Sequence, residues 1–225
     1  MRSHPVQQQR ITCLNDLVPR AGKYVLYWMQ QSQRAEFNHA LEYAIWRAND
    51  AMQPVLVVFG LMDDYPEANH RHYRFMLEGL QETQRKLHDR GIQMVVQLGS
   101  PDEVALSLSH DASLVVCDRG YLRHQRAWRA QVARAAGCQV VQVESDVVVP
   151  VESASDHAEF AARTIRPKIH RLWEEFLVPL RRQAVRKESL DMRSESEDPV
   201  SYTHLRAHET RYVIAYAVFC LKKGG

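Results

Sequence analysis

The chain has 225 residues, of which 45% are hydrophobic and 25% are charged, as is usual for a soluble globular protein. Its longest apolar runs, at residues 24–29 and 54–62, are far shorter than the roughly 20 residues of a membrane-spanning helix, so we expect no membrane association. The formal net charge is +2, but residues 1–198 carry 25 basic and 26 acidic side chains, which gives no support to a basic nucleic-acid-binding body.

The amino-terminal residues and the cysteines predict a cytoplasmic protein. The start, MRSHPVQQQR, is not followed by the apolar stretch of a secretory signal. The four cysteines show no C-x-x-C spacing, so we expect buried, reduced thiols rather than metal ligands or disulfides. They are Cys13, Cys117, Cys138 and Cys220.

From residue 23 to residue 146, short apolar runs alternate with longer segments of helical periodicity, which is the pattern of βαβ units. Five runs are almost continuously hydrophobic, as strands covered on both faces must be. They are residues 23–29, 54–61, 92–99, 113–120 and 138–144. We therefore expect an α/β fold with a doubly wound, Rossmann-like, five-stranded parallel sheet and flanking helices.

Four helices are expected between these strands. The first has an apolar stripe that begins at Phe37, and the second ends before Gly91, where a left-handed C-cap is expected. The third begins at Ser100–Glu103, which reads as a capping box with proline at the first helical position. The fourth runs from about residue 122 to residue 137.

Less regular segments follow the last strand. We expect a connection up to Pro167 and then an amphipathic linker helix, whose apolar stripe, ending at Leu180, packs either on the sheet or on a following domain. Residues 181–198 are charged and poor in apolar side chains, which predicts disorder or a solvated helix end. Residues 199–225 resemble a translated sequencing adapter and predict a non-native tail; an ordinary terminal strand is the alternative.

Five blocks of sequence, in the same order, resemble the amino-terminal part of class II cyclobutane pyrimidine dimer DNA photolyases. They extend together from residue 22 to about residue 180, and none of them rests on a common short motif. The blocks are YVLYWMQQSQRAEFNHALEYAI (24–45), VVFGLMDDYPEANHRHYRFMLEGL (57–80), VVCDRGYLRHQRAWR (115–129), VVQVESDVVVPVE (140–152) and AARTIRPKIHRLWEEFL (161–177).

The resemblance implies a deoxyribodipyrimidine photo-lyase, a flavoprotein that repairs UV-damaged DNA with light. In that family a helical carboxy-terminal domain holds FAD and the DNA lesion, and we expect this domain and all catalytic residues to lie outside the chain. The α/β domain is a scaffold that, in many members, binds an antenna cofactor such as an 8-hydroxy-5-deazaflavin. The expected parts are an extension (1–21), the antenna domain (22–150), a linker with the start of the FAD domain (151–198) and the tail (199–225). We expect a monomer without repair activity of its own.

Open parallel sheets bind ligands beyond the carboxyl ends of their strands, at the point where the strand order reverses. The candidate cofactor-binding residues are therefore those that end three of the predicted strands or follow directly after them. They are Trp28, Met29, Arg34, Phe59, Gly60, Leu61, Asp118, Arg119 and Gly120. The polar loop Gln30–Arg34 offers further hydrogen-bond donors to a ligand. For Trp28 and Met29, the alternative to a place in the cofactor pocket is a place in the hydrophobic core.

Other functions find less support. No G-x-G-x-x-G or G-x-S-x-G motif follows a strand, which argues against a dehydrogenase and a hydrolase. The pair His70 and His72 lacks a third metal ligand and predicts an ordinary helix start. Arginines at 119, 123, 126 and 129, interleaved with Tyr121 and Trp128, resemble a nucleic-acid stripe but favour a solvated or interdomain face. A stand-alone nucleotide- or flavin-binding module, similar to electron-transfer flavoproteins or cryptochromes, is the alternative to a photolyase.

Overall fold

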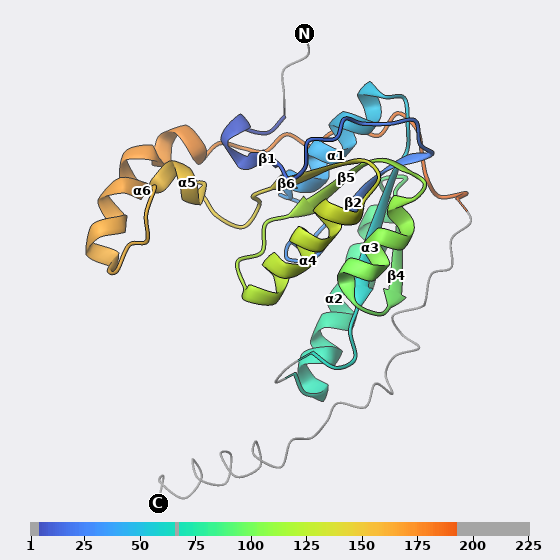
Figure 1. The fold of residues 1–225 in the computed structure, drawn as a ribbon, viewed down its shortest axis with the longest axis horizontal. Helices are drawn as coiled ribbons and strands as arrows, with labels where there is room; N and C mark the ends of the chain where they lie inside the picture. The colour runs from blue at the N-terminus through green and yellow to red at the C-terminus, as the bar shows by residue number, and fades with distance from the viewer. Residues whose placement is uncertain (1–4, 66–67, 193–225) are drawn as a thin grey trace, which may run out of the picture.

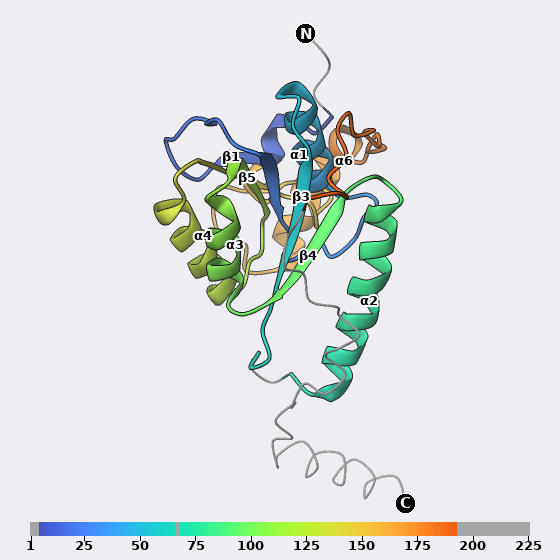
Figure 2. The same cartoon turned by 90° about the vertical axis from the view of Figure 1, so that its right-hand side faces the viewer.

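The fold is taken from a computed structural model that describes residues 5–65 and 68–192. The expected tail (199–225) and Cys220 lie outside the described residues. Helices cover both faces of one central sheet, and two further helices, α5 and α6, stand beside it (Figures 1 and 2). No helix within the two described ranges is both long and apolar enough to cross a membrane.

The sheet has six strands among the described residues, in the order β1-β6-β5-β2-β3-β4. The strands are β1 (Ile11–Cys13), β2 (Tyr24–Trp28), β3 (Val55–Leu61), β4 (Gln93–Leu98), β5 (Ala112–Asp118) and β6 (Gln139–Val143). The five predicted strands are confirmed as a parallel set. The predicted number was too small, because β1 joins the edge antiparallel to β6 and its three residues are too few for a periodic pattern.

The helices are α1 (His39–Asp50), α2 (His70–His88), α3 (Pro101–Ser109), α4 (Arg123–Ala135), α5 (Val151–Ala154) and α6 (Ala162–Phe176), with a 3-10 turn at Gln8–Arg10. Two apolar clusters lie on opposite faces of the sheet. Leu41 of α1 and Leu80 of α2 belong to one cluster, and Val104 of α3 and Val132 of α4 belong to the other. This doubly wound arrangement buries both faces, which explains why the strands are apolar at nearly every position.

Three predictions at helix ends have different outcomes. Gly91 has φ of 74°, so the left-handed end of α2 is confirmed. Phe37 does not begin the stripe of α1: it has φ of 49°, is 75% exposed and precedes Asn38, whose side chain caps the helix. The capping box of α3 is also wrong, because the Ser100 hydroxyl donates to the side chain of Asp102 instead of capping the helix.

The thiols and the amphipathic helix also differ from expectation. Cys117 and Cys138 are buried and free as expected, but Cys13 is exposed on the edge strand. Helix α6 contains Pro167 instead of starting after it. The predicted stripe divides between two places. Its last residue, Leu180, packs against a core cluster of the sheet domain, which was one of the two expected alternatives. Ile165, Ile169 and Leu172 instead contact a small cluster formed by Val149, Ala154 and Phe176.

Residues 181–192, here called the docked linker, are ordered against the sheet domain, so the expected disorder or solvated helix end is wrong for this part. The Ser189 N–H donates to the Gly91 carbonyl at 3.0 Å, and the Ser189 hydroxyl accepts from the Gln93 N–H at 2.7 Å. Asn49 donates to the Ala184 carbonyl at 2.8 Å. A charged segment can thus be held by its backbone, which composition does not reveal.

Candidate functional site

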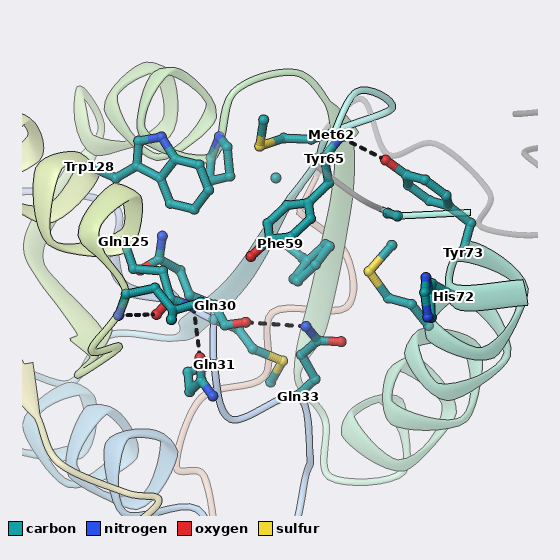
Figure 3. A pocket seen from close by; sticks show the side chains of 16 residues that line it. Gln30, Gln31, Gln33, Phe59, Met62, Tyr65, His72, Tyr73, Gln125 and Trp128 are labelled. Carbon is teal, nitrogen blue, oxygen red and sulfur yellow. Dashed lines mark hydrogen bonds between the residues drawn. The ribbon is translucent and has the colours of Figure 1, made fainter. Parts of the chain in front are cut away.

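A cavity of about 500 Å³ opens at the carboxyl ends of β2 and β3, next to the point between β2 and β5 where the strand order reverses. Its walls come from the loops after β2 and β3, the first turns of α2 and the start of α4 (Figure 3). Most of the lining is apolar or aromatic: Met29, Phe59, Gly60, Met62, Tyr65, Ala68, Tyr73, Met76, Pro101, Leu122 and Trp128. This is the usual composition of a site for a planar organic ligand.

Four glutamines are among the cavity-lining residues, and none of the lining residues is Lys, Arg, Asp or Glu. They are Gln30, Gln31, Gln33 and Gln125. In Figure 3, Gln30, Gln31 and Gln125 lie on the side of Trp128, whereas His72 and Tyr73 of α2 lie on the opposite side. The cavity therefore offers neutral hydrogen-bonding groups and no cation for a phosphate.

Three of these amides are engaged within the protein. Gln125 Nε2 donates to Gln31 Oε1 at 2.7 Å, and Gln125 Oε1 accepts from the Leu122 N–H at 3.2 Å. Gln33 Nε2 donates to the Gln30 carbonyl oxygen at 3.2 Å.

Gln30 is different, because both polar atoms of its side chain are buried without a hydrogen-bond partner among the described residues. The residue is only 8% exposed and lines the cavity. An unsatisfied buried polar group destabilises a protein by about 1–3 kcal/mol. Because neither atom is accessible from the cavity, the amide lies behind the cavity wall rather than on its surface.

Asp118, at the end of β5, fixes the loop that carries the glutamines. Its Oδ2 accepts the backbone N–H groups of Gln30, Gln31 and Ser32 at 3.0, 3.1 and 3.1 Å. Three converging N–H groups form an anion-binding nest, and here an internal carboxylate fills it. The backbone of this loop is therefore not available to bind a phosphate.

A second layer of buried groups supports that carboxylate. The Tyr27 hydroxyl donates to Asp118 Oδ1 at 2.8 Å and accepts from Asn38 Nδ2 at 2.8 Å. Burial raises the pKa of Asp118, while the hydrogen bonds from Gln30, Ser32 and Tyr27 lower it. Burial also raises the pKa of Tyr27, so this hydroxyl remains a donor. The network makes the loop rigid before any ligand arrives.

One rim of the cavity is formed by three aromatic rings. The Tyr65 hydroxyl and His124 Nε2 are 2.9 Å apart and share a hydrogen bond. The His124 ring in turn contacts the Trp128 ring edge-on, with centroids 4.9 Å apart. The hydrogen bond between Tyr65 and His124 joins the loop after β3 to α4.

The nine predicted site residues fall into separate groups. Met29, Phe59 and Gly60 line the cavity. Trp28 and Leu61 are fully buried in the two apolar cores, and Met29 belongs to a core cluster while it also lines the cavity, so the core alternative holds for Trp28 and Met29.

The other four predicted residues do not line the cavity. Arg34 pairs with Asp146 at 2.7 Å. Arg119 pairs with Glu144 and Glu152 at 3.3 and 2.8 Å. Asp118 accepts hydrogen bonds from the backbone of the loop after β2. Gly120 lies against the Gln125 side chain with no room for a Cβ atom.

Sequence reasoning missed the contribution of α4 and α2. Gln125 and Trp128 were missed because they lie three and six residues beyond the loop after β5, on a helix that leans over the cavity. The arginines around them do not form one stripe, because Arg119 is ion-paired and Arg129 is buried with a hydrogen bond to the Gln125 carbonyl. A tryptophan near a helix start at the carboxyl edge of a sheet was the available signal.

Comparison with known proteins identifies the family. Residues 25–186 match the model of the DNA photolyase family. The chain belongs to the DNA photolyase family. It is 47% identical to a deoxyribodipyrimidine photo-lyase of Methanothermobacter thermautotrophicus over 205 residues, which cover 91% of this chain and 46% of that protein. It is 38% identical to a deoxyribodipyrimidine photo-lyase of Potorous tridactylus, covering 68% of this chain and 29% of that protein.

Solved photolyase structures share the fold of this family member. An archaeal photolyase from Sulfolobus tokodaii, described with two FAD molecules and a novel light-harvesting cofactor, aligns with a TM-score of 0.64 at 15% identity, over 83% of this chain and 42% of that one. A bacterial class III photolyase from Agrobacterium tumefaciens aligns with a TM-score of 0.60 at 17% identity, over 80% and 38%. The chain spans less than half the length of the curated relatives it matches.

Proposed function

We propose that the chain is the antenna and scaffold domain of a class II photolyase that repairs cyclobutane pyrimidine dimers with light. The observation that carries the proposal is the cavity at the carboxyl edge of the sheet, with its apolar and aromatic walls and its uncharged glutamines. The class II assignment is supported by the five blocks of sequence between residues 24 and 177. Curated relatives that are 34–47% identical are named photo-lyases.

The cavity fits an 8-hydroxy-5-deazaflavin better than a phosphate-bearing cofactor. A deazaflavin ring is planar and carries carbonyl and N–H groups, which suit apolar walls and neutral amides. The cavity-lining residues include no Lys or Arg, and Asp118 already fills the backbone nest. When bound, such a pigment would absorb light and pass excitation energy to the flavin.

The rest of the proposal concerns the whole protein. Residues 22–150 form the antenna domain, preceded by an extension (1–21) and followed by a linker (151–198) and a non-native tail (199–225). FAD and UV-damaged DNA are bound by a carboxy-terminal helical half outside these residues. The protein is monomeric and cytoplasmic, and this part alone does not repair DNA. The family membership disfavours a stand-alone electron-transfer module.

Pigment binding can be measured by titrating 8-hydroxy-5-deazariboflavin with the full 225-residue chain and recording its fluorescence. We expect quenching or a spectral shift that saturates. Trp128→Ala should weaken binding because Trp128 lines the cavity. Trp173→Ala, on the exposed side of α6, is the matched control and should leave binding unchanged. An unaltered spectrum at high protein concentration contradicts the antenna function.

A further inference from the structure

Resting on the proposed function, we infer that the exposed face of α6 is the surface on which the carboxy-terminal half of the same protein docks. Residues three and four apart share a helix face, so α6 and its cap carry two stripes offset by one residue. The inner stripe closes on the small cluster beside α5 and consists of Ile165, Ile169, Leu172 and Phe176. The outer stripe is exposed throughout and consists of Arg166, His170, Trp173 and Leu177.

The outer stripe lies where exposed apolar side chains are concentrated. Six of the fifteen exposed large hydrophobic residues in the described part of the chain fall within residues 148–178. They are Val148, Val151, Phe160, Trp173, Leu177 and Val178. Single exposed apolar residues are ordinary on a protein surface, but a concentration of them marks an interaction site.

Helices α5 and α6 stand beside the sheet as an arm (Figure 1), and a buried arginine fixes this arm in place. The Arg10 guanidinium donates to the carbonyl oxygens of Val147 and Val148 at 2.9 and 2.6 Å. It also lies over the Phe176 ring, 5.6 Å from the ring centroid. Gln7 Nε2 donates to the Phe176 carbonyl at 3.4 Å. The outer stripe is therefore presented on a fixed element, which lowers the entropic cost of docking.

The relatives favour the carboxy-terminal half as the occupant of this surface. The match to the Methanothermobacter thermautotrophicus photo-lyase covers 46% of that protein, so more than half of it lies outside the match. The family match reaches residue 186 and thus includes α6, which is the last helix among the described residues. On the proposed function the remaining half follows the docked linker. A tethered domain has a high effective concentration at an apolar surface beside its attachment point.

The composition of the outer stripe describes the surface that would cover it. Trp173 and Leu177 require an apolar hollow, and Arg166 lies on the same face about two turns before Trp173. The first turn of α6 contains Arg163 and no acidic residue. Positive charges near a helix N-terminus are repelled by the helix dipole, so carboxylates on the partner would relieve a repulsion that the arm alone retains. A hollow with acidic groups at one end fits the mixed character of interfaces between domains of one chain.

The test asks whether Trp173 becomes protected when the carboxy-terminal half is present. Hydroxyl-radical labelling, read by mass spectrometry, is applied to the 225-residue chain and to a fusion. In the fusion, residues 1–192 are followed by the carboxy-terminal part of the M. thermautotrophicus photo-lyase, and bound FAD shows that this part is folded. We expect Trp173 to be labelled at least about fivefold more slowly in the fusion, because the core of an interface is fully buried. Met52, exposed after α1, should be labelled equally in both proteins.

A substitution in the outer stripe should reverse the protection. In the fusion, Trp173→Asp places a charge in the apolar hollow, so Leu177 should be labelled as fast as in the 225-residue chain. Val18→Asp makes a comparable change at an exposed position before β2 and should leave Leu177 protected. Protection of Leu177 that persists in Trp173→Asp contradicts the assigned face.

The outcomes separate the docking surface from the proposed function. Equal labelling of Trp173 in the two proteins overturns the inference: if both rates are fast the stripe stays open, and if both are slow a second copy or residues 193–225 cover it. If the fusion does not hold FAD, a tryptophan at the aligned position of the intact M. thermautotrophicus protein is labelled instead, and a rate equal to that of the 225-residue chain overturns the inference. A failed deazaflavin titration contradicts the antenna function alone, because the cavity includes no residue of α6.

Discussion

Arg90 and Glu42 form a buried ion pair that also holds the docked linker. Arg90 Nη2 lies 2.7 Å from Glu42 Oε1, and both side chains are 3% exposed. Glu42 Oε2 accepts the Gln183 N–H at 2.5 Å, and Arg90 Nη2 donates to the Gln183 carbonyl at 3.1 Å. One ion pair thus connects α1, the end of α2 and the segment that leaves the sheet domain.

Breaking this pair from one side should strongly destabilise the domain. Glu42→Leu leaves the Arg90 guanidinium buried without its counter-ion, so we predict a loss of about 3–5 kcal/mol in the free energy of unfolding, measured by urea denaturation. Glu78→Leu breaks the exposed Arg74–Glu78 pair and should change stability by no more than about 0.5 kcal/mol. If Glu42→Leu and Glu78→Leu lower the free energy of unfolding by similar amounts, the Arg90–Glu42 pair is not buried in the way described here.

Removing both charges should restore most of the stability of the domain but leave the docked linker less firmly attached. In the double variant Glu42→Leu with Arg90→Met no buried charge is left unpaired, so most of the lost stability should return. The linker still loses both contacts at Gln183, and trypsin should cut faster at Arg186 and Lys187. Cleavage at the native rate would indicate that the backbone bonds at Ser189 hold the linker without the ion pair.

A second prediction concerns the carboxylate behind the glutamine loop. Asp118→Asn replaces one carboxylate oxygen by an NH2 group, so either the N–H groups of the loop Gln30–Ser32 or the Tyr27 hydroxyl must face another donor, and the negative charge that attracts the loop N–H groups is lost. We predict a decrease of about 2–4 kcal/mol in the free energy of unfolding and weaker deazaflavin binding. Asp63→Asn, at an exposed position in the loop after β3, is the control and should affect neither quantity. Unchanged pigment affinity in Asp118→Asn argues that the loop does not need this anchor.

Much of the sheet was predictable, because strands covered on both faces must be apolar at nearly every position. Strand β1 was not, since Ile11, Thr12 and Cys13 are partly or fully exposed on an edge and carry no periodic signal. The docked linker was mispredicted for a related reason. Its stability comes from backbone bonds to residues about 100 positions away in sequence, and local composition does not contain them.

The site was predictable only where one strand rule applied. Ligands bind beyond the carboxyl ends of parallel strands, and Met29, Phe59 and Gly60 line the cavity at that edge. The rule does not say which strand-end side chains point into an apolar core, as those of Trp28 and Leu61 do. Nor does it reach side chains such as Trp128, which enter from a helix one or more turns away from the strand.

The third prediction is a pH dependence that arises at His39. Burial lowers the pKa of His39 to about 4, and the charges of Arg10 and Arg34 add to that shift. The unfolded chain, with a pKa near 6.5, binds a proton that the folded state excludes. The contribution of His39 to stability is therefore complete above about pH 6.5 and is lost progressively as the pH falls toward about 4.

His39→Gln should weaken this dependence, because a neutral amide does not titrate. The measurement is the free energy of unfolding in urea at several values between about pH 4.5 and pH 7.5. The variant should show a smaller decrease with falling pH than the native chain. His88→Gln, at an exposed position near the end of α2, should keep the native slope. If the free energy of unfolding changes with pH equally in the native chain and in His39→Gln, the pH dependence does not arise at His39.

The last prediction compares Gly60, in strand β3, with Gly79, in helix α2. A Cβ atom on Gly60, in the cavity wall, would lie 2.6 Å from the Cα atom of Pro101, where α3 begins. Gly60→Ala must push β3 away from α3, and we predict a loss of about 1–3 kcal/mol in stability together with weaker deazaflavin binding. A Cβ on Gly79, on the exposed surface of α2, would meet nothing within 4 Å. Gly79→Ala should therefore stabilise the protein by up to about 1 kcal/mol, because alanine favours a helix. Opposite signs for the same chemical change would show that β3 and α3 touch at the cavity wall, whereas stabilisation by both substitutions would mean that they do not.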